Sequence, residues 1–184
     1  VSRDYGARAK AFMDIITLIV QCDLSRSLTF LFDAEGADRE YLGLVPSSLV
    51  YNGASPNAEG NHIGISHYGT SDGSMCVTRD RYYLSFFTSL LSSLKAARDP
   101  SGTPILDNTI VLAGHSVIDG NHSWGNTSGM CTVVGGGRSF FHPGNAYSLG
   151  SYDHLDLLYT ISQALGLPNT AFPAGSRYNH LLAI

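Results

Sequence analysis

The sequence DNTIVLAGHSVIDGNHSWGN covers residues 107–126 and joins an apolar run to a loop of polar side chains. Isoleucine, valine and leucine at positions 110–112 favour a buried β-strand. Histidine, aspartate and asparagine side chains crowd the loop that follows. In open α/β sheets, functional residues gather beyond the carboxyl ends of the strands. The stretch therefore predicts a strand over residues 108–113 and a candidate site in the loop behind it.

Helices are expected on both sides of this stretch. Residues 6–22 carry apolar side chains at helical spacing, and we expect one stripe to face the core: Phe12, Ile15, Ile16, Ile19 and Val20. Residues 78–95 follow a capping Thr78 and predict a helix with this buried side: Tyr83, Phe86, Phe87, Leu90, Leu91 and Leu94. A last helix is expected from a Ser151 cap to Gly166, with these residues facing inward: Leu155, Leu158, Tyr159 and Leu165.

Two further short runs are typical of strands, residues 28–32 (LTFLF) and residues 130–134. Gly135, Gly136 and Gly137 end the second run. Their backbone amides could cradle an anion, but the missing Gly-Lys-Ser/Thr ending favours a tight chain reversal. The resulting order of helices and strands predicts an α/β fold, a partial sheet with flanking helices. Because three strands are few, we expect residues 1–184 to be a single α/β module and a fragment or processed part of a longer chain.

Composition narrows the class of protein. Apolar residues make up 43% and charged residues 14% of the chain, which excludes a disordered protein. The net charge of -4 leaves no basic surface for nucleic acid. No apolar stretch reaches the ~20 residues of a transmembrane helix. Polar positions are mostly serine, asparagine, threonine and glycine, with few glutamates and lysines. This composition is more common in secreted proteins than in cytosolic ones.

The cysteines lie far apart, at positions 22, 76 and 131, so they match no zinc-binding pattern. Cys76 and Cys131 both follow methionine in Gly/Ser-rich surroundings. A disulfide between Cys76 and Cys131, formed in an oxidising compartment, is one interpretation. Three free thiols are the alternative.

The sequence around Ser116 superficially matches the nucleophile elbow of α/β-hydrolases. That elbow needs a second glycine two residues after the serine, where this chain has Ile118. No helical pattern follows, so Ser116 is interpreted as a turn residue.

A metal site is the stronger hypothesis for the same loop. His115, Asp119 and His122 are ligand types that Zn, Fe or Mn accept. His67, in a second histidine-containing stretch over residues 61–69, could complete the set if that stretch folds over the same crevice. The spacing is not diagnostic of a metal. The alternative is that these histidines only form hydrogen bonds with loop backbone.

Four segments of the chain resemble a family of uncharacterised secreted bacterial proteins, frequent in planctomycetes and myxobacteria. They are, in family order, residues 13–32, 64–70 (GISHYGT), 106–121 and 133–138 (VVGGGR). The family is exported with a twin-arginine signal and is distantly related to the alkaline phosphatase/sulfatase superfamily. The resemblance implies the C-terminal half of an alkaline-phosphatase-like fold, and a periplasmic or extracellular location.

The resemblance also implies a set of metal ligands. The superfamily has an Asp-His pair at the end of a strand, where this chain has Gly114 and His115. His67 and His122 correspond to two further ligands, whereas Trp124 replaces a family histidine. A two-metal site needs several carboxylates to hold its cations, and the superfamily's nucleophile belongs to the N-terminal half.

Two functions follow as hypotheses. The first is a non-catalytic or degenerate structural or binding subunit, whose partner is another protein chain or a missing N-terminal portion. The second is a metal-dependent phosphate or sulfate ester hydrolase, whose nucleophile lies outside this chain. The lost carboxylate favours the first.

Overall fold

The computed structural model describes residues 5–32, 74–114, 131–138, 140–141, 144 and 154–168. Within these ranges the protein combines helices with a small sheet, which confirms the mixed α/β class. The elements in chain order are α1 (Tyr5–Gln21), α3 (Ser74–Ala96), a 3-10 helix (Ile105–Asn108), β1 (Ile110–Gly114), β2 (Thr132–Gly136) and α4 (His154–Ala164). None of the described helices is long and apolar enough to cross a membrane.

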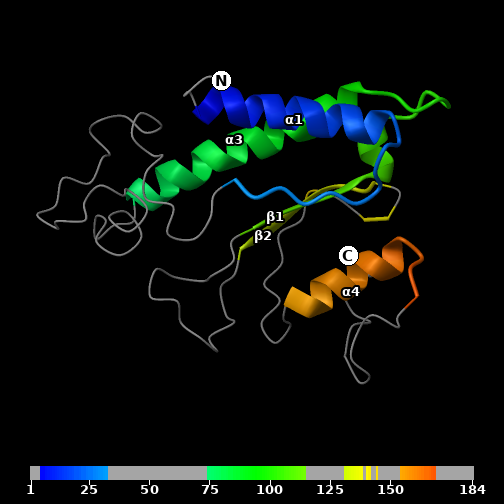
Figure 1. Ribbon diagram of the computed structural model, residues 1–184. Helices are drawn as coiled ribbons and strands as arrows, with labels where there is room; N and C mark the ends of the chain where they lie inside the picture. Colours follow the sequence, from blue (N-terminus) through cyan, green and yellow to red (C-terminus); the bar gives the residue numbers. More distant parts are fainter. Residues whose placement is uncertain are drawn as a thin grey trace, which may run out of the picture.

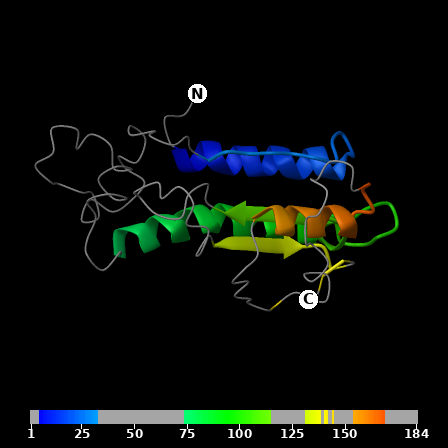
Figure 2. The ribbon, with the colours of Figure 1, turned by 90° about the horizontal axis from the view of Figure 1, so that it is seen from below.

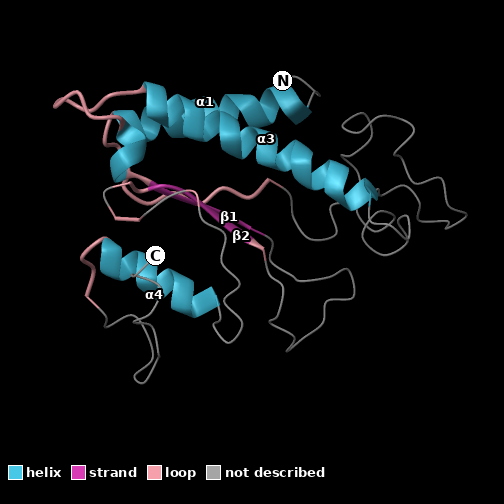
Figure 3. Cartoon of the chain, turned by 180° about the vertical axis from the view of Figure 1, so that it is seen from behind, coloured by secondary structure: helices cyan, strands magenta, loops and turns pink. Residues whose placement is uncertain are grey.

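The two described strands form an antiparallel ribbon between helices. Ile110 pairs with Gly136 at one end of the ribbon, and Gly114 pairs with Thr132 at the other. Figure 1 shows α1 and α3 on one side of the ribbon and α4 on the other, and the opposite view in Figure 3 agrees. In Figure 2, seen from below, the two strands lie side by side and α1 and α3 run in the same direction. The strands predicted over residues 108–113 and 130–134 are confirmed, each displaced by one or two residues toward the C-terminus.

The core lies where α1, α3 and the 3-10 helix meet the ribbon. Its buried cluster consists of Met13, Leu90, Leu94 and Ile105, and partly buried side chains from every neighbouring element pack around it. Helix α3 also lies directly on β2, because a Cβ on Gly135 would come within 2.7 Å of Leu91. Val111 pairs with Gly135 and packs against the same cluster, so this face of the ribbon points toward α3.

The predicted buried side of α3 is confirmed. Phe87, Leu90 and Leu94 are buried, and the remaining expected side chains are half-buried. The helix begins at Ser74, four residues before the expected cap Thr78.

The predicted stripe of α1 is only partly right. Ile16 and Val20 pack on the core as expected, but Phe12 and Ile15 are each 49% exposed. Ala9 and Met13 are buried in their place. Helix α1 is apolar on more than one side, so its periodicity did not determine which side would meet α3.

The strand predicted over residues 28–32 is wrong. Residues 27–31 have no regular secondary structure. Instead, the segment runs beneath α1 (Figure 1) and is anchored by aromatic contacts. The ring of Phe30 lies 5.2 Å from that of Phe12, and the ring of Phe32 lies 5.7 Å from that of Phe86. Side-chain packing therefore holds this apolar run in place without a ladder of backbone hydrogen bonds.

The predicted inward face of α4 is also partly wrong. Leu158 and Tyr159 are half-buried, whereas Leu155 and Leu165 are 45% and 47% exposed. The buried side chains are polar: Asp156, Thr160 and Ser162. Hydroxyl groups can lie inside a helix packing surface when they bond backbone carbonyls, as Thr160 does with the carbonyl of Asp156. The expected cap Ser151 lies outside the described residues.

Helices α1 and α4 end in the same way. Gly166 has a φ of 69°, its amide donates to the carbonyl of Gln163, and the amide of Leu167 donates to that of Ser162. This is the Schellman arrangement, and it confirms Gly166 as the stop of the last helix. At the end of α1, Asp23 takes the corresponding position with a φ of 51°. Asp23 is also held by Arg26, whose guanidinium donates two hydrogen bonds to its carboxylate.

Candidate functional site

The histidine-containing loop starts and finishes at one end of the ribbon. Gly114 is the last residue of β1 and pairs with Thr132, the first residue of β2. His115 therefore follows directly on a residue held in the sheet. The antiparallel pairing brings the two ends of the 115–130 connection together, as in a hairpin with a long loop. The strands β1 and β2 therefore do not form the open parallel sheet in which functional residues gather beyond the carboxyl ends of the strands.

The predicted ligands themselves lie outside the described residues. This applies to His67, His115, Asp119 and His122, and also to Ser116. Their convergence on one metal ion stays a prediction. Among the described residues, no group of three or more histidine, cysteine, aspartate or glutamate side chains could hold a metal ion.

Gly114 takes the position where the resemblance expects an aspartate ligand. A Cβ built on Gly114 would lie 3.3 Å from the carbonyl oxygen of Cys131 and 3.3 Å from the hydroxyl oxygen of Thr132. Both contacts are tighter than an ordinary van der Waals approach. The Cβ atom of any side chain at position 114 would therefore press on Thr132 and on the carbonyl of Cys131. These residues would have to shift to make room for it.

The predicted chain reversal begins at Gly137, since Gly135 and Gly136 still pair within β2. Gly136 and Gly137 have φ angles of 76° and 63°, and the amide of Gly137 donates to the carbonyl of Leu106 at 3.0 Å. The carbonyl of Gly137 in turn accepts from the amides of Phe140 and Phe141. Because the amide of Gly137 is already bonded within the protein, the anion-cradle alternative loses one of its three donors.

The cysteines favour the free-thiol alternative over the predicted disulfide. Cys131 is exposed just before β2 and is a free thiol, as is the exposed Cys22. The side chain of Cys76 lies outside the described residues. The structure thus contains Cys131 unpaired and not as half of a Cys76–Cys131 disulfide.

The sequence Asp99-Pro100-Ser101-Gly102 predicts the end of the second helix, and in the structure it forms a turn after α3. One carboxylate oxygen of Asp99 accepts hydrogen bonds from the hydroxyl and amide of Ser101 and from the amide of Thr103, at 2.6 to 2.9 Å. The Ser101 hydroxyl bond, with the backbone amides, holds the pKa of Asp99 below its ordinary value, against a smaller opposing effect of burial. The Asp-Pro-Ser-Gly sequence was a sufficient signal for this turn.

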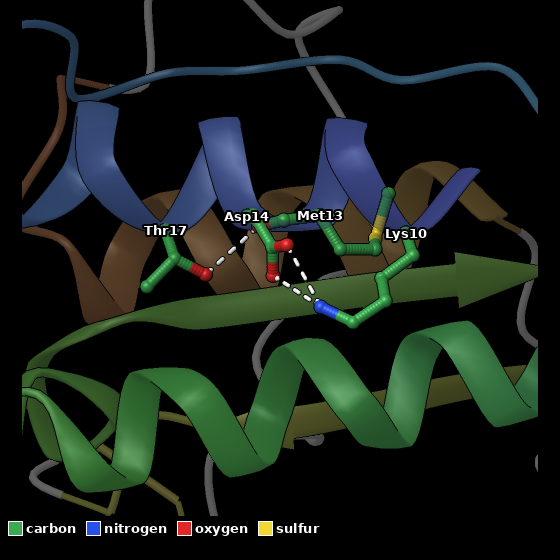
Figure 4. A network of polar contacts seen from close by, with 4 residues as sticks. All are labelled: Lys10, Met13, Asp14 and Thr17. Carbon is green, nitrogen blue, oxygen red and sulfur yellow. Dashed lines mark hydrogen bonds and ion pairs between the residues drawn. The ribbon is translucent and has the colours of Figure 1, made fainter. Parts of the chain in front are cut away.

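A second polar network lies on α1 and is shown in Figure 4. The ammonium group of Lys10 lies 2.8 Å from a carboxylate oxygen of Asp14, and the hydroxyl of Thr17 donates to the carbonyl of Met13. Both ion-paired side chains are mostly exposed. Such i,i+4 pairs add little stability, so this network marks a solvent-facing side and not a reaction centre.

Comparison with known proteins adds no relative: no family model, curated protein or solved structure matches the chain.

Proposed function

We propose that this chain is part of an exported module with an alkaline-phosphatase-like fold, which has lost catalysis and acts as a structural or binding subunit. Its partner would be another protein chain or an N-terminal portion of a longer protein, in the periplasm or outside the cell. The proposal rests on the resemblance of four segments to the secreted bacterial family and on the mixed α/β arrangement.

The single observation that carries the loss of catalysis is the geometry at Gly114. A two-metal phosphoryl or sulfuryl site needs carboxylates to neutralise and hold its cations. Position 114 has no side chain, and the 3.3 Å approaches to Cys131 and Thr132 disfavour one. With Trp124 in place of a second expected ligand, the remaining candidates supply one carboxylate, Asp119, and imidazoles.

Metal content tests this proposal directly. The full chain is incubated with Zn²⁺, Mn²⁺ or Fe²⁺ at neutral pH, dialysed, and assayed by elemental mass spectrometry. We expect no stoichiometric metal, and no hydrolysis of p-nitrophenyl phosphate or sulfate. Stoichiometric metal that is lost in His115→Ala would refute a passive module. Asn108→Ala, on the exposed end of the 3-10 helix, serves as the control for nonspecific effects of substitution.

One observation favours the alternative, a metal-dependent ester hydrolase with its nucleophile on another portion. The Gly114–Thr132 pairing anchors both ends of the 115–130 connection, and an anchored loop can hold ligands in a fixed geometry. For this function, Gly114→Asp should raise metal affinity, since it restores the expected carboxylate. If Gly114→Asp instead binds no more metal than the parent chain, while circular dichroism shows an intact fold, the alternative loses its support.

A further inference from the structure

Helix α1 has three distinct sides. At 100° per residue, one side carries the buried residues Ala9 and Met13 and the partly buried residues Ile16 and Val20. A second side is polar and carries Lys10, Asp14, Thr17 and Gln21, three of which are drawn in Figure 4. The third side carries Phe12, Ile15 and Leu18, with Arg8 one turn before Phe12. A surface helix normally needs only one apolar side, so the third side requires its own explanation.

The third side continues into the segment after the helix. The amide of Leu24 bonds to the carbonyl of Ile19, which keeps Leu24 at the end of α1. The contact between Phe12 and Phe30 then brings the neighbouring leucines beside the helix. We call the combined surface the outer strip; it consists of Phe12, Ile15, Leu18, Leu24, Leu28 and Leu31.

The outer strip is exposed, and each of its members is uncharged. Its side chains are between 42% and 74% exposed. No charged residue occurs from Ile15 to Cys22, although the chain has 11 basic and 15 acidic residues. A surface of this kind favours an apolar partner over a charged ligand or nucleic acid.

The area of the outer strip matches one half of a protein–protein interface. If a large apolar residue exposes roughly 150–200 Å² when free, these exposed fractions amount to about 500–700 Å². A standard interface covers about 800 Å² on each partner, and some 56–65% of it is apolar, or about 450–520 Å². The strip therefore supplies the apolar area that one side of a stable dimer needs.

We propose that the outer strip is an interface between two copies of this chain. In a two-fold dimer both copies contribute the same patch. A charged side chain on the patch would therefore meet like charges on the other copy, so such a patch should carry few charges. The outer strip meets this condition because its members are uncharged, so two copies with a net charge of -4 can bring it together with the nearest charges of the helix, Arg8 and Asp14, at its margin. This inference is independent of the proposed function.

Sedimentation velocity of the full chain, from low to high micromolar concentration, measures the self-association. We expect a concentration-dependent dimer that Leu18→Glu abolishes, since two carboxylates would be buried face to face. Gln21→Glu is the matched control because it adds the same charge to the polar side of the same helix. It should leave the dimer intact, and circular dichroism verifies that both variants retain their helices.

The unmodified chain offers a second measurement that needs no folded variant. Cys22 lies on the same side of α1 as the outer strip, whereas Cys131 lies at the start of β2, and both thiols are exposed and free. Maleimide labelling of Cys22, followed by peptide mass spectrometry, should slow several-fold as the protein concentration rises, while labelling of Cys131 stays constant.

Three results would overturn the inference. A monomer at every concentration would leave the outer strip to a different protein or a lipid surface. A dimer that persists in Leu18→Glu would place the interface elsewhere. Equal protection of Cys22 and Cys131 would also exclude an interface centred on α1.

Discussion

Replacing Gly136 by alanine tests how closely the end of β2 packs against the 3-10 helix. Gly136 has a φ of 76°, a backbone conformation that costs an L-residue roughly 1–2 kcal/mol. Its added Cβ would also collide with the carbonyl oxygen of Thr109 and would lie 2.7 Å from Leu106. Forcing an extra methyl into such a packed position costs roughly another 1–3 kcal/mol. The expected loss of unfolding free energy is therefore about 2–5 kcal/mol.

Gly102 provides the matched control. Its φ of 87° carries the same conformational penalty, but no atom lies within 4 Å of a Cβ built there. Gly102→Ala should therefore lose only about 1–2 kcal/mol. Urea unfolding followed by circular dichroism gives both values.

The difference between the two variants isolates the close approach of the backbone. Equal losses in both variants would mean that Gly136 has room around it and that the 3-10 helix does not pack on the end of β2. A negligible loss in both would contradict the positive φ angles as well.

Three further changes test the core, a helix end and a turn. Leu94→Ala should lower the unfolding free energy by roughly 2–5 kcal/mol, because Leu94 is 1% exposed, whereas Leu165→Ala, at a 47% exposed residue, should lower it far less in the same urea titration. Asp23→Gly should be more stable than Asp23→Ala by differential scanning calorimetry, because glycine adopts the φ of 51° without strain; the reverse order would contradict the assigned end of α1. The pKa of Asp99 is lowered mainly by its Ser101 hydrogen bond, so this carboxylate stabilises the fold above its unfolded pKa, and that stability is lost as pH falls through the lower folded pKa. An NMR titration midpoint of Asp99 at or above about 3.9, the ordinary aspartate value, would disprove that bond.

The pairing of β1 with β2 also changes how the candidate site must be assembled. In a parallel sheet, several strands would present loops at one edge, and ligands could come from each of them. In the observed ribbon, one connection leaves β1 and returns to β2 at the same end, between Gly114 and Thr132. His115, Asp119 and His122 therefore belong to one anchored connection, and only His67 would have to arrive from another part of the chain.

Local chemistry determined the elements that sequence alone could predict. The helical spacing of Phe87, Leu90 and Leu94 predicted both α3 and its buried side, since serine, threonine and lysine occupy the opposite side of its second half. Gly166 ended α4, and the glycines after Val134 reversed the chain, because few other residues adopt positive φ angles. For the candidate site, sequence predicted the ligand types in the loop but not their positions in space.

Only tertiary structure decided which of several apolar surfaces became buried. Helix α1 presents two apolar sides, and contact with α3 chose the side with Met13 over the side with Ile15. Residues 28–32 had the composition of a strand, yet the rings of Phe30 and Phe32 pack on helices and no ladder forms. The physical reason is common to both cases. Periodicity is a property of neighbouring residues, whereas burial and strand pairing depend on partners that are distant in the sequence.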